Sequence, residues 1–315
     1  MGGIENMAKS KLEYVPWLPK AKVSDLFPYA YKLELIEDID TLKQVLSNQF
    51  DYMSFDTETT GLNQEEIDIV GYSICFDGIT SYYIPVWHFN FGLGEEALDL
   101  IYERMCKCKT VFMFNMRYDV RVMEYHGYTT LYKDIVESGL SEEEIYKKKL
   151  ELTRKAFIKY DMTKVNSFDV QALVYLVDTN IKFPSLKSSE EWYLGWRGAS
   201  FEQTVSKAQN ENAIKLDRDG NIKSMNFFYL TPQEAYEYAA VDALGTFLLA
   251  LKLMPFYYEA KFSGELDIKC LMPLTRFENE LTAIDTGLLK TYSVYLDNKI
   301  KEVQHRCWNT ARKRI

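Results

Sequence analysis

The sequence predicts an α/β protein, in which helices flank a β-sheet. Short aromatic and apolar runs with the composition of buried strands occur at 52–56, 67–76, 80–86 and 111–115. Segments with the apolar spacing of helices precede and follow these runs. The chain has 315 residues, of which 47% are hydrophobic, so it can bury a sizeable core.

The first elements are predicted from local signals, taken in chain order. Helical spacing occurs at 36–50 and again at 95–107, on either side of the first three strand-like runs. The pair DG at 77–78 predicts a hairpin between the second and third strands. The helix that follows the fourth strand is expected to end at Gly127. The run SFDVQALVYLVDTN at 167–180 predicts an amphipathic helix.

The longest helix is predicted over 231–260. Thr231 caps it, Pro232 occupies its first position, and Glu234 stands at the third position of a capping box. Two further helices are expected after it, at 265–281 and from 291 onward.

Composition limits the classes of function. The chain has 37 basic and 46 acidic residues, a formal net charge of −9, so any binding to nucleic acid must be local or metal-mediated. No run approaches the roughly 18–20 apolar residues of a transmembrane helix, which predicts no membrane partner. Five cysteines, an odd number without a secretory signal, favour reduced thiols and a cytoplasmic location, in the host cytoplasm if the protein is viral.

Two acids stand close together at the end of the first strand, in FDTETTGL at 55–62. Alternation along a strand puts Asp56 and Glu58 on one face, about 6–7 Å apart along the chain. Like charges repel, and burial penalises each of them. A divalent cation is the simplest compensating group. A DxE pair by itself is more often a surface pair or a cap.

Two further acids fit this pair. Asn115 and Asp119 in NMRYD stand four residues apart at a strand-to-helix junction, and Tyr238 and Asp242 in YAAVD have the same spacing within a helix. Together the four acids can converge on two divalent ions about 3.5–4 Å apart, which suits in-line displacement at phosphorus. Tyr238 would hold the attacking water, because a phenol orients water but is a poor base.

On these residues the sequence resembles the DEDDy class of 3′–5′ exonucleases, specifically the proofreading domain of family A DNA polymerases, the bacterial DNA polymerase I type. FDTETTGL, NMRYD and YAAVDA match its three motifs, and the likeness covers residues 31–262. It implies a ribonuclease H-like fold with a mixed five-stranded sheet. The runs from 52 to 86 would form an antiparallel meander, with 111–115 parallel beside it and helices on both faces.

The resemblance also implies a role for each site residue. Asp56, Glu58 and Asp242 would bind the first of two divalent metal ions, Mg²⁺ or Mn²⁺. Asp56 and Asp119 would share the second, Asp119 through water, and Tyr238 would complete the catalytic set. The residues implied to bind substrate are Thr57, Leu62, Asn115 and Phe201. Among these, Leu62 would wedge against the terminal base and Phe201 would stack near the 3′ end.

The expected organisation has three parts. They are an N-terminal arm at 1–28, an exonuclease domain at 29–262 with an insertion at about 129–165, and a helical segment at 263–315 that resembles the start of a polymerase domain. No palm or fingers motifs follow in the sequence. The polymerase portion would therefore lie on the same full-length chain or on a separate subunit.

The expected activity is metal-dependent 3′–5′ hydrolysis of single-stranded or frayed DNA, releasing nucleoside 5′-monophosphates during proofreading. One alternative is an RNA-trimming exonuclease of the ribonuclease D kind, which shares the three motifs. Another is a non-catalytic subunit that grips DNA or a polymerase, although the intact acid set argues against it.

Overall fold

The computed structural model describes most of the chain. The described residues are 31–61, 67–137, 139–141, 143–145, 147–148, 159–181, 184–196, 204, 208–216, 222–259, 261–278 and 286–312. Contacts divide the chain into two compact units, Met1–Arg276 and Phe277–Ile315, and each is considered by itself. The expected N-terminal arm lies outside the described residues.

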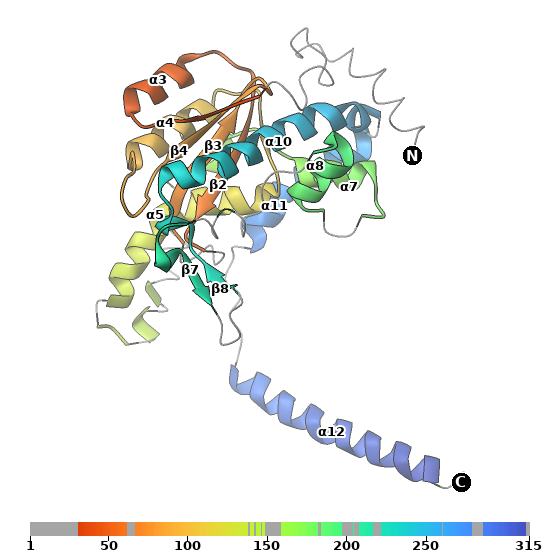
Figure 1. The fold of residues 1–315 in the computed structure, drawn as a ribbon. Coiled ribbons are helices and arrows are strands. Elements are labelled where there is room, and N and C mark those ends of the chain that lie inside the picture. Colours follow the sequence, from red (N-terminus) through yellow and green to blue (C-terminus); the bar gives the residue numbers. More distant parts are fainter. Residues whose placement is uncertain are drawn as a thin grey trace. The chain divides into compact units, whose positions relative to one another are not determined.

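A mixed sheet forms the centre of the first unit (Figure 1). Its strands are β1 (Lys32–Leu35), β2 (Tyr52–Thr59), β3 (Ile69–Cys75), β4 (Thr80–Pro85), β5 (Thr110–Met113) and β6 (Ser167–Asp169). Their order across the sheet is β1-β4-β3-β2-β5-β6. The pairs β2–β3 and β3–β4 are antiparallel, whereas β1–β4, β2–β5 and β5–β6 are parallel.

The α/β class, the antiparallel meander and the parallel strand beside it are as expected from the sequence. The hairpin at the DG pair is also present, with Gly78 at φ +73° and the Asp77 carboxylate accepting from the amides of Ile79 and Thr80 at 2.7 and 2.8 Å. Among the described residues the sheet has six strands rather than five. The run expected as a helix from 167 begins as the short strand β6, and its helix starts only at Val170.

Three helices cover one face of the sheet. They are α3 (Ile39–Ser47), α4 (Glu95–Met105) and α5 (Met116–Glu137). Leu42 from α3, Leu98 from α4 and Val120 from α5 join Met53 and Phe55 of β2 in one buried apolar cluster. The helix α5 does not end at Gly127 but continues to Glu137, because one glycine costs a helix only about 1 kcal/mol.

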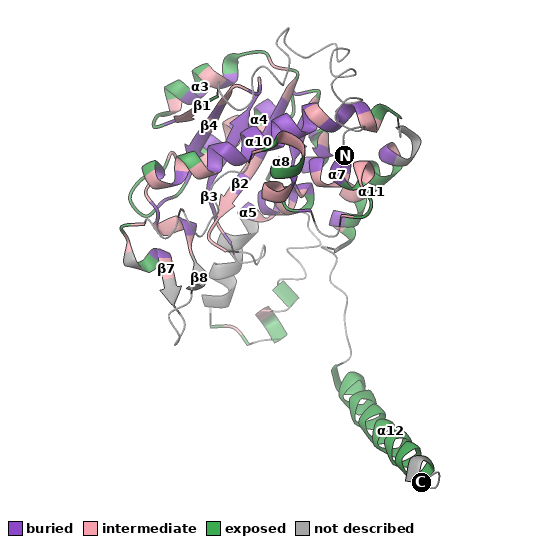
Figure 2. Cartoon of the chain, turned by 45° about the vertical axis from the view of Figure 1, so that its right-hand side comes forward, coloured by how far each residue is buried: buried purple, intermediate pink, exposed green. Residues whose placement is uncertain are grey.

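The helix α10 (Pro232–Glu259) crosses the other face and contacts β1 to β5. It begins as expected, since Thr231 and Glu234 form a reciprocal capping box. It packs against α7 (Val170–Val177) and α8 (Leu186–Leu194). By length and composition α10 could cross a membrane, but most of it is buried in the first unit, as Figure 2 shows, so it is a core helix.

The remaining elements are smaller or lie toward the C-terminus. They are the strands β7 (Ile214–Leu216) and β8 (Ile222–Met225), the 3₁₀ turns η2 (Met162–Lys164), η3 (Glu211–Ala213) and η4 (Phe227–Tyr229), and the helices α11 (Lys261–Glu278) and α12 (Thr286–Arg312). The strands β7 and β8 form a separate antiparallel hairpin. The helix α12 belongs to the second unit and starts a little before the residue expected.

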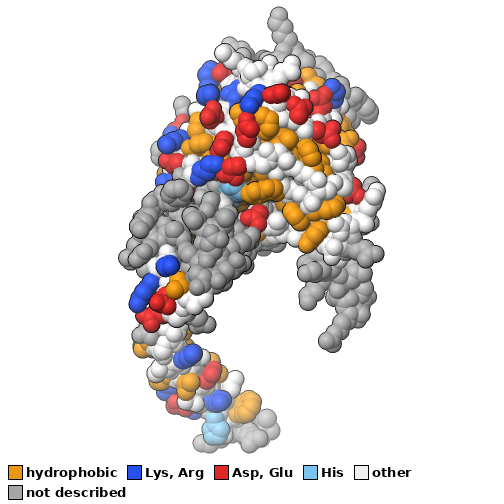
Figure 3. All heavy atoms as spheres, turned by 90° about the vertical axis from the view of Figure 1, so that its left-hand side faces the viewer, with side chains coloured by type: hydrophobic (Ala, Val, Ile, Leu, Met, Phe, Trp, Pro, Cys, Tyr) orange, Lys and Arg blue, Asp and Glu red, His pale blue; other side chains and the backbone are white. Residues whose placement is uncertain are grey.

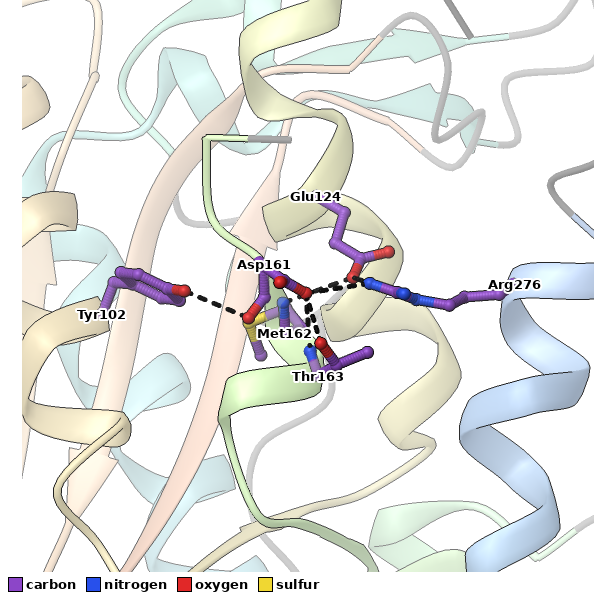
Figure 4. A network of polar contacts seen from close by, with 6 residues as sticks. All are labelled: Tyr102, Glu124, Asp161, Met162, Thr163 and Arg276. Atoms are coloured by element: carbon purple, nitrogen blue, oxygen red, sulfur yellow. Dashed lines mark hydrogen bonds and ion pairs between the residues drawn. The ribbon is translucent and has the colours of Figure 1, made fainter. Parts of the chain in front are cut away.

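An ion pair between an accessible arginine and a buried glutamate fastens α11 to the rest of the first unit (Figure 4). The Arg276 guanidinium donates to the Glu124 carboxylate of α5 at 3.0 Å and to the Asp161 carboxylate at 2.9 Å. Glu124 is only 3% exposed, and burial raises the pKa of its carboxyl although Arg276 opposes that shift. The amide of Met162 also donates to Glu124, at 3.3 Å. Removing Arg276 would therefore leave a buried carboxylate without its cation.

We expect Arg276→Met to lower the free energy of unfolding by about 1–3 kcal/mol, because a buried charged acceptor loses its donor. Urea unfolding of the purified chain at neutral pH measures this. In a Glu124→Gln background the same change should cost clearly less, since the charge that Arg276 neutralises is gone. An equal loss in both backgrounds would contradict this account of the pair.

Candidate active site

The strand β2 carries the first two acids and presents them toward α10. Ser54, Asp56 and Glu58 share one face of the strand, opposite the buried ring of Phe55. The Ser54 hydroxyl donates to the carbonyl oxygen of Ala243 in α10 at 2.7 Å, which fixes the helix against this face. The alternation expected from FDTETTGL therefore holds, and it aims both carboxylates at one helix.

Asp242 reaches the same place from α10. Its side chain lies beside the Ser54–Ala243 contact and is 7% exposed. One carboxylate oxygen from each of Asp56, Glu58 and Asp242 lies within 4.8 Å of the other two. The strand and the helix thus bring together three of the four acids that the sequence singled out.

Asp119 approaches β2 from α5, on the opposite face of the sheet. Its Oδ1 accepts from the Thr57 amide at 3.0 Å and from the Thr57 hydroxyl at 2.6 Å. Because Thr57 stands between Asp56 and Glu58, this contact holds Asp119 at the same end of the strand. Asp119 is outside the group of three carboxylates, but its charge still acts on Asp56.

The turn before α5 positions Asp119. Asn115 has φ +62°, a left-handed conformation that asparagine tolerates better than most residues, and its carbonyl accepts from the Tyr118 amide at 2.8 Å. The Asp169 carboxylate at the end of β6 accepts from the Met116 amide at 3.1 Å and also caps α7. Asn115 therefore has a backbone role at this junction, in addition to the substrate contact expected from the resemblance.

Burial and mutual repulsion make the carboxyls weak acids. Desolvation is the largest cause of the raised pKa of each carboxyl, even though the side chains of Asp56 and Glu58 are only half-buried. Desolvation and then the neighbouring carboxylates raise the pKa of Asp56 well above its usual value, and the same holds for Glu58. Desolvation raises the pKa of Asp119 to about 7, although the hydrogen bonds from Thr57 oppose it.

A lysine that the sequence analysis did not single out lies among these acids. Lys187 of α8 forms an ion pair with Asp242 Oδ1, and its Nζ lies 3.9 Å from Glu190 Oε2. Burial disfavours its charge, but Asp242 and Glu190 outweigh burial and raise the pKa of Lys187. The lysine therefore carries a positive charge at the cluster, and this charge opposes the pKa rise of Asp242.

Tyr238 lies one helical turn before Asp242 and is hydrogen-bonded to it. Burial first, and then the charges of Asp242 and Glu58, raise the pKa of the phenol well above 10. The Lys187 ammonium stands over its ring, 5.2 Å from the centroid. Tyr238 is consequently a neutral phenol at neutral pH, suited to orienting a group by hydrogen bonding and unsuited to acting as a base.

Some residues named from the sequence lie outside the described residues. They are Leu62, Phe201 and, within the expected insertion at 129–165, residues 138, 142, 146 and 149–158. Their implied roles at the substrate remain predictions.

Two residues of the site were missed in the sequence, Lys187 and Asp169. Lys187 stands in LKSSEEWYLG at 186–195, where a lysine is unremarkable without knowledge of the facing helix. Asp169 was assigned to the interior of a helix, whereas it caps that helix. Aspartate favours the N-cap position of helices, and this preference is the sequence signal that points to Asp169 as the start of α7.

Comparison with known proteins supports the resemblance found in the motifs. The chain is 27% identical over 187 residues to DNA polymerase I of Borreliella burgdorferi, which covers 59% of this chain and 16% of that protein. The chain therefore spans about a sixth of the length of this curated relative. No family model matches the sequence.

One solved structure supports the same fold. The polymerase domain of Pol1 from M. smegmatis, in complex with a DNA primer-template and a deoxynucleotide, superposes with a TM-score of 0.54 at 12% identity, covering 85% of this chain and 36% of that chain. Escherichia coli RNase D, an exoribonuclease, gives 0.47 at 17% identity over 79% of this chain and 51% of that chain. The expected fold class and the resemblance to DNA polymerase I are confirmed.

The donor set fits a hard divalent cation. Carboxylate oxygens are the ligands that Mg²⁺ and Mn²⁺ prefer, and three of them gather in one partly accessible cluster. Burial first, and then mutual repulsion, raise the pKa values of Asp56 and Glu58, and a bound cation would stabilise their charged forms against both.

We expect the titration of Asp119 to make the stability of the protein in EDTA depend on pH. Its folded pKa of about 7 exceeds the ordinary value of 3.8, so the folded state holds the proton more tightly and loses stability as pH rises from about 4 to 7. Asp119→Asn keeps an acceptor for Thr57 and removes the titration. The free energy of unfolding of the variant should therefore rise relative to that of wild type across this range, by roughly 1–4 kcal/mol at pH 7. Urea unfolding at several pH values measures the difference, and a constant difference would contradict the assignment.

Proposed function

We propose that the chain is a metal-dependent 3′–5′ exonuclease that hydrolyses the terminal phosphodiester of single-stranded or frayed DNA. Water would attack the phosphorus, the bond to the 3′ oxygen of the preceding nucleotide would break, and a nucleoside 5′-monophosphate would leave. The observation that carries this proposal is the meeting of Asp56, Glu58 and Asp242 within 4.8 Å, with Asp119 held to the same strand end through Thr57.

The carboxylates would hold two divalent ions, Mg²⁺ or Mn²⁺. Asp56, Glu58 and Asp242 would bind the first, and Asp56 with Asp119 the second. When bound, such ions supply charge stabilisation and an activated water for in-line displacement. Thr57 fixes the orientation of Asp119 with two hydrogen bonds. Ser54 fixes α10, and with it Asp242, against the strand.

Tyr238 would orient the attacking water. Its raised pKa keeps the proton on the phenol, so the ring oxygen can donate one hydrogen bond and accept another. Asp242, one turn along the helix, fixes the phenol's direction. The tyrosine thus acts by position, which agrees with the reading of YAAVD in the sequence.

DNA is the favoured substrate because the sequence relative is a DNA polymerase I. The chain carries a net charge of −9, so a broad basic field does not draw the substrate in. On the face in Figure 3, the described acidic and basic side chains are interspersed rather than grouped into a basic band. Metal contacts to the terminal phosphate and stacking on bases would then carry binding, which suits a substrate of any sequence.

Proofreading for a family A polymerase follows from the same resemblance. In this proposal residues 29–262 form the exonuclease domain, and residues 263–315 lead toward a polymerase portion on the full-length chain or on a separate subunit. The relative extends far beyond the matched region, which supports a polymerase portion elsewhere.

The test uses a 5′-labelled single-stranded DNA oligonucleotide and its RNA counterpart, each with Mg²⁺, Mn²⁺ or EDTA. We expect a ladder that shortens from the 3′ end of DNA, absent in EDTA and lost in Asp56→Asn. The variant keeps the size and shape of the side chain, and circular dichroism checks its fold. A ladder mainly on RNA would show that RNA, not DNA, is the substrate. No cleavage with either metal would overturn the nuclease proposal for this chain.

We expect Tyr238→Phe to slow DNA cleavage by about 10–100-fold while binding of the oligonucleotide stays close to wild type, since the change removes one orienting hydrogen bond. Single-turnover cleavage gives the rate, and fluorescence anisotropy in Ca²⁺ gives the affinity. An unchanged rate would remove Tyr238 from the mechanism. A loss confined to affinity would make it a substrate-binding residue instead.

A further inference from the structure

The contact between α8 and α10 pairs two residues from each helix beside the acid cluster. Lys187 and Glu190 stand three residues apart on α8, and Asp242 and Gly245 stand three apart on α10, so each pair shares a helix face. Lys187 forms an ion pair with Asp242, and Glu190 packs against Gly245. The cation of one helix therefore stands between a carboxylate of the other helix and one of its own.

Lys187 is well enclosed at this position. Its side chain is 16% exposed, its Nζ contacts Asp242 Oδ1, and its charge also acts on Asp56. The ammonium thus acts as a positive charge on all three carboxylates. An ammonium and a divalent cation that both occupy this small volume repel each other strongly, so both cannot hold Asp242 equally well.

Glu190 is a second carboxylate partner for the Lys187 ammonium. Its carboxylate is fully buried, and Oε2 lies 3.9 Å from Lys187 Nζ, longer than a hydrogen bond. Space for this carboxylate depends on Gly245, because a Cβ atom at that position would overlap Glu190 Oε1. This buried carboxylate already forms a long ion pair with the lysine, without a hydrogen bond, and so offers a short path for the ammonium.

We propose that Lys187 is an internal counter-ion that competes with the divalent cation for Asp242 and moves to Glu190 when the cation binds. The proposal rests on the proposed function in taking Asp56, Glu58 and Asp242 as ligands of one cation. Turning about its own side-chain bonds is enough to move the ammonium between Asp242 and Glu190, and the backbone of α8 need not shift. Lys187 is accordingly a positioning residue that sets the affinity of the site.

The charge balance explains what such a lysine achieves. Without a divalent cation, the ammonium offsets part of the repulsion among the carboxylates and so stabilises the fold. With one bound, the ammonium pairs with Glu190, so the lysine keeps a carboxylate partner after the exchange. The affinity for the divalent cation is lower than the carboxylates alone would give, because an ion pair must be broken first.

The test measures binding of Ca²⁺ and of Mg²⁺ by calorimetry, and the melting temperature in EDTA, without reference to cleavage. The variants are Lys187→Met, Glu190→Gln and the double variant, with Lys187→Arg as the matched control that keeps the charge. We expect Lys187→Met to melt at a lower temperature than wild type in EDTA yet to bind the divalent cation on the order of tenfold more tightly. Lys187→Arg should stay nearer to wild type in both measurements.

Glu190→Gln should weaken divalent-cation binding several-fold, because the ammonium loses the position to which it moves. In the Lys187→Met background the same change should have a clearly smaller effect. Circular dichroism and the melting transition in EDTA check that each variant is folded. If Lys187→Met prevented folding, the Glu190→Gln and Lys187→Arg proteins would still test the exchange.

Weaker binding in Lys187→Met would overturn the proposal and make the lysine a residue that merely orients Asp242 for the cation. An equal effect of Glu190→Gln in both backgrounds would overturn the movement to Glu190. Either result would leave the exonuclease proposal intact. Failure of wild type to bind any divalent cation would instead overturn the metal site and, with it, this inference.

Discussion

The docking of α10 across β2 is the contact on which the rest of the site depends. It brings a carboxylate from near the end of the first unit to two carboxylates near its beginning, and the Ser54–Ala243 hydrogen bond sets the distance. Apolar burial along α10 stabilises this arrangement against the repulsion of the charges. The core therefore holds together carboxylates that would otherwise repel one another apart. Their raised pKa values are typical of a functional site.

The two faces of β2 contribute different residues to the site. One face carries Asp56 and Glu58 toward α10, and the other carries Thr57 toward Asp119 of α5. A single strand thus gathers four acids from three elements, because alternate side chains point to opposite faces. This arrangement needs no long loop, and each acid is attached to a rigid element.

Local patterns predicted much of this fold. The aromatic run of β2, the DG turn and the capping box at Thr231 are each recognisable within a few residues. The strand β6 was not predicted, because three residues carry no period and its pairing with β5 depends on a distant segment. Its sequence also runs directly into α7, so the helical signal covered it.

The acids of the site were predictable because their spacing along a strand or a helix fixes their direction. Lys187 was not, since its position depends on how α8 packs against α10, a relation that one sequence does not express. Glu190 has the same character, because the space it occupies exists only where the facing helix has Gly245. The charges that compensate a site are thus harder to predict than the charges that define it.

The anchor at Arg276 has a mechanical consequence for the site. Arg276 is the last residue of the first unit, and its partner Glu124 lies on the same helix as Asp119, five residues further along, or about 7–8 Å of helix. This ion pair therefore links the end of α11 directly to the helix that carries Asp119. A change in how α11 packs would thus reach Asp119 through one salt bridge and less than two turns of α5.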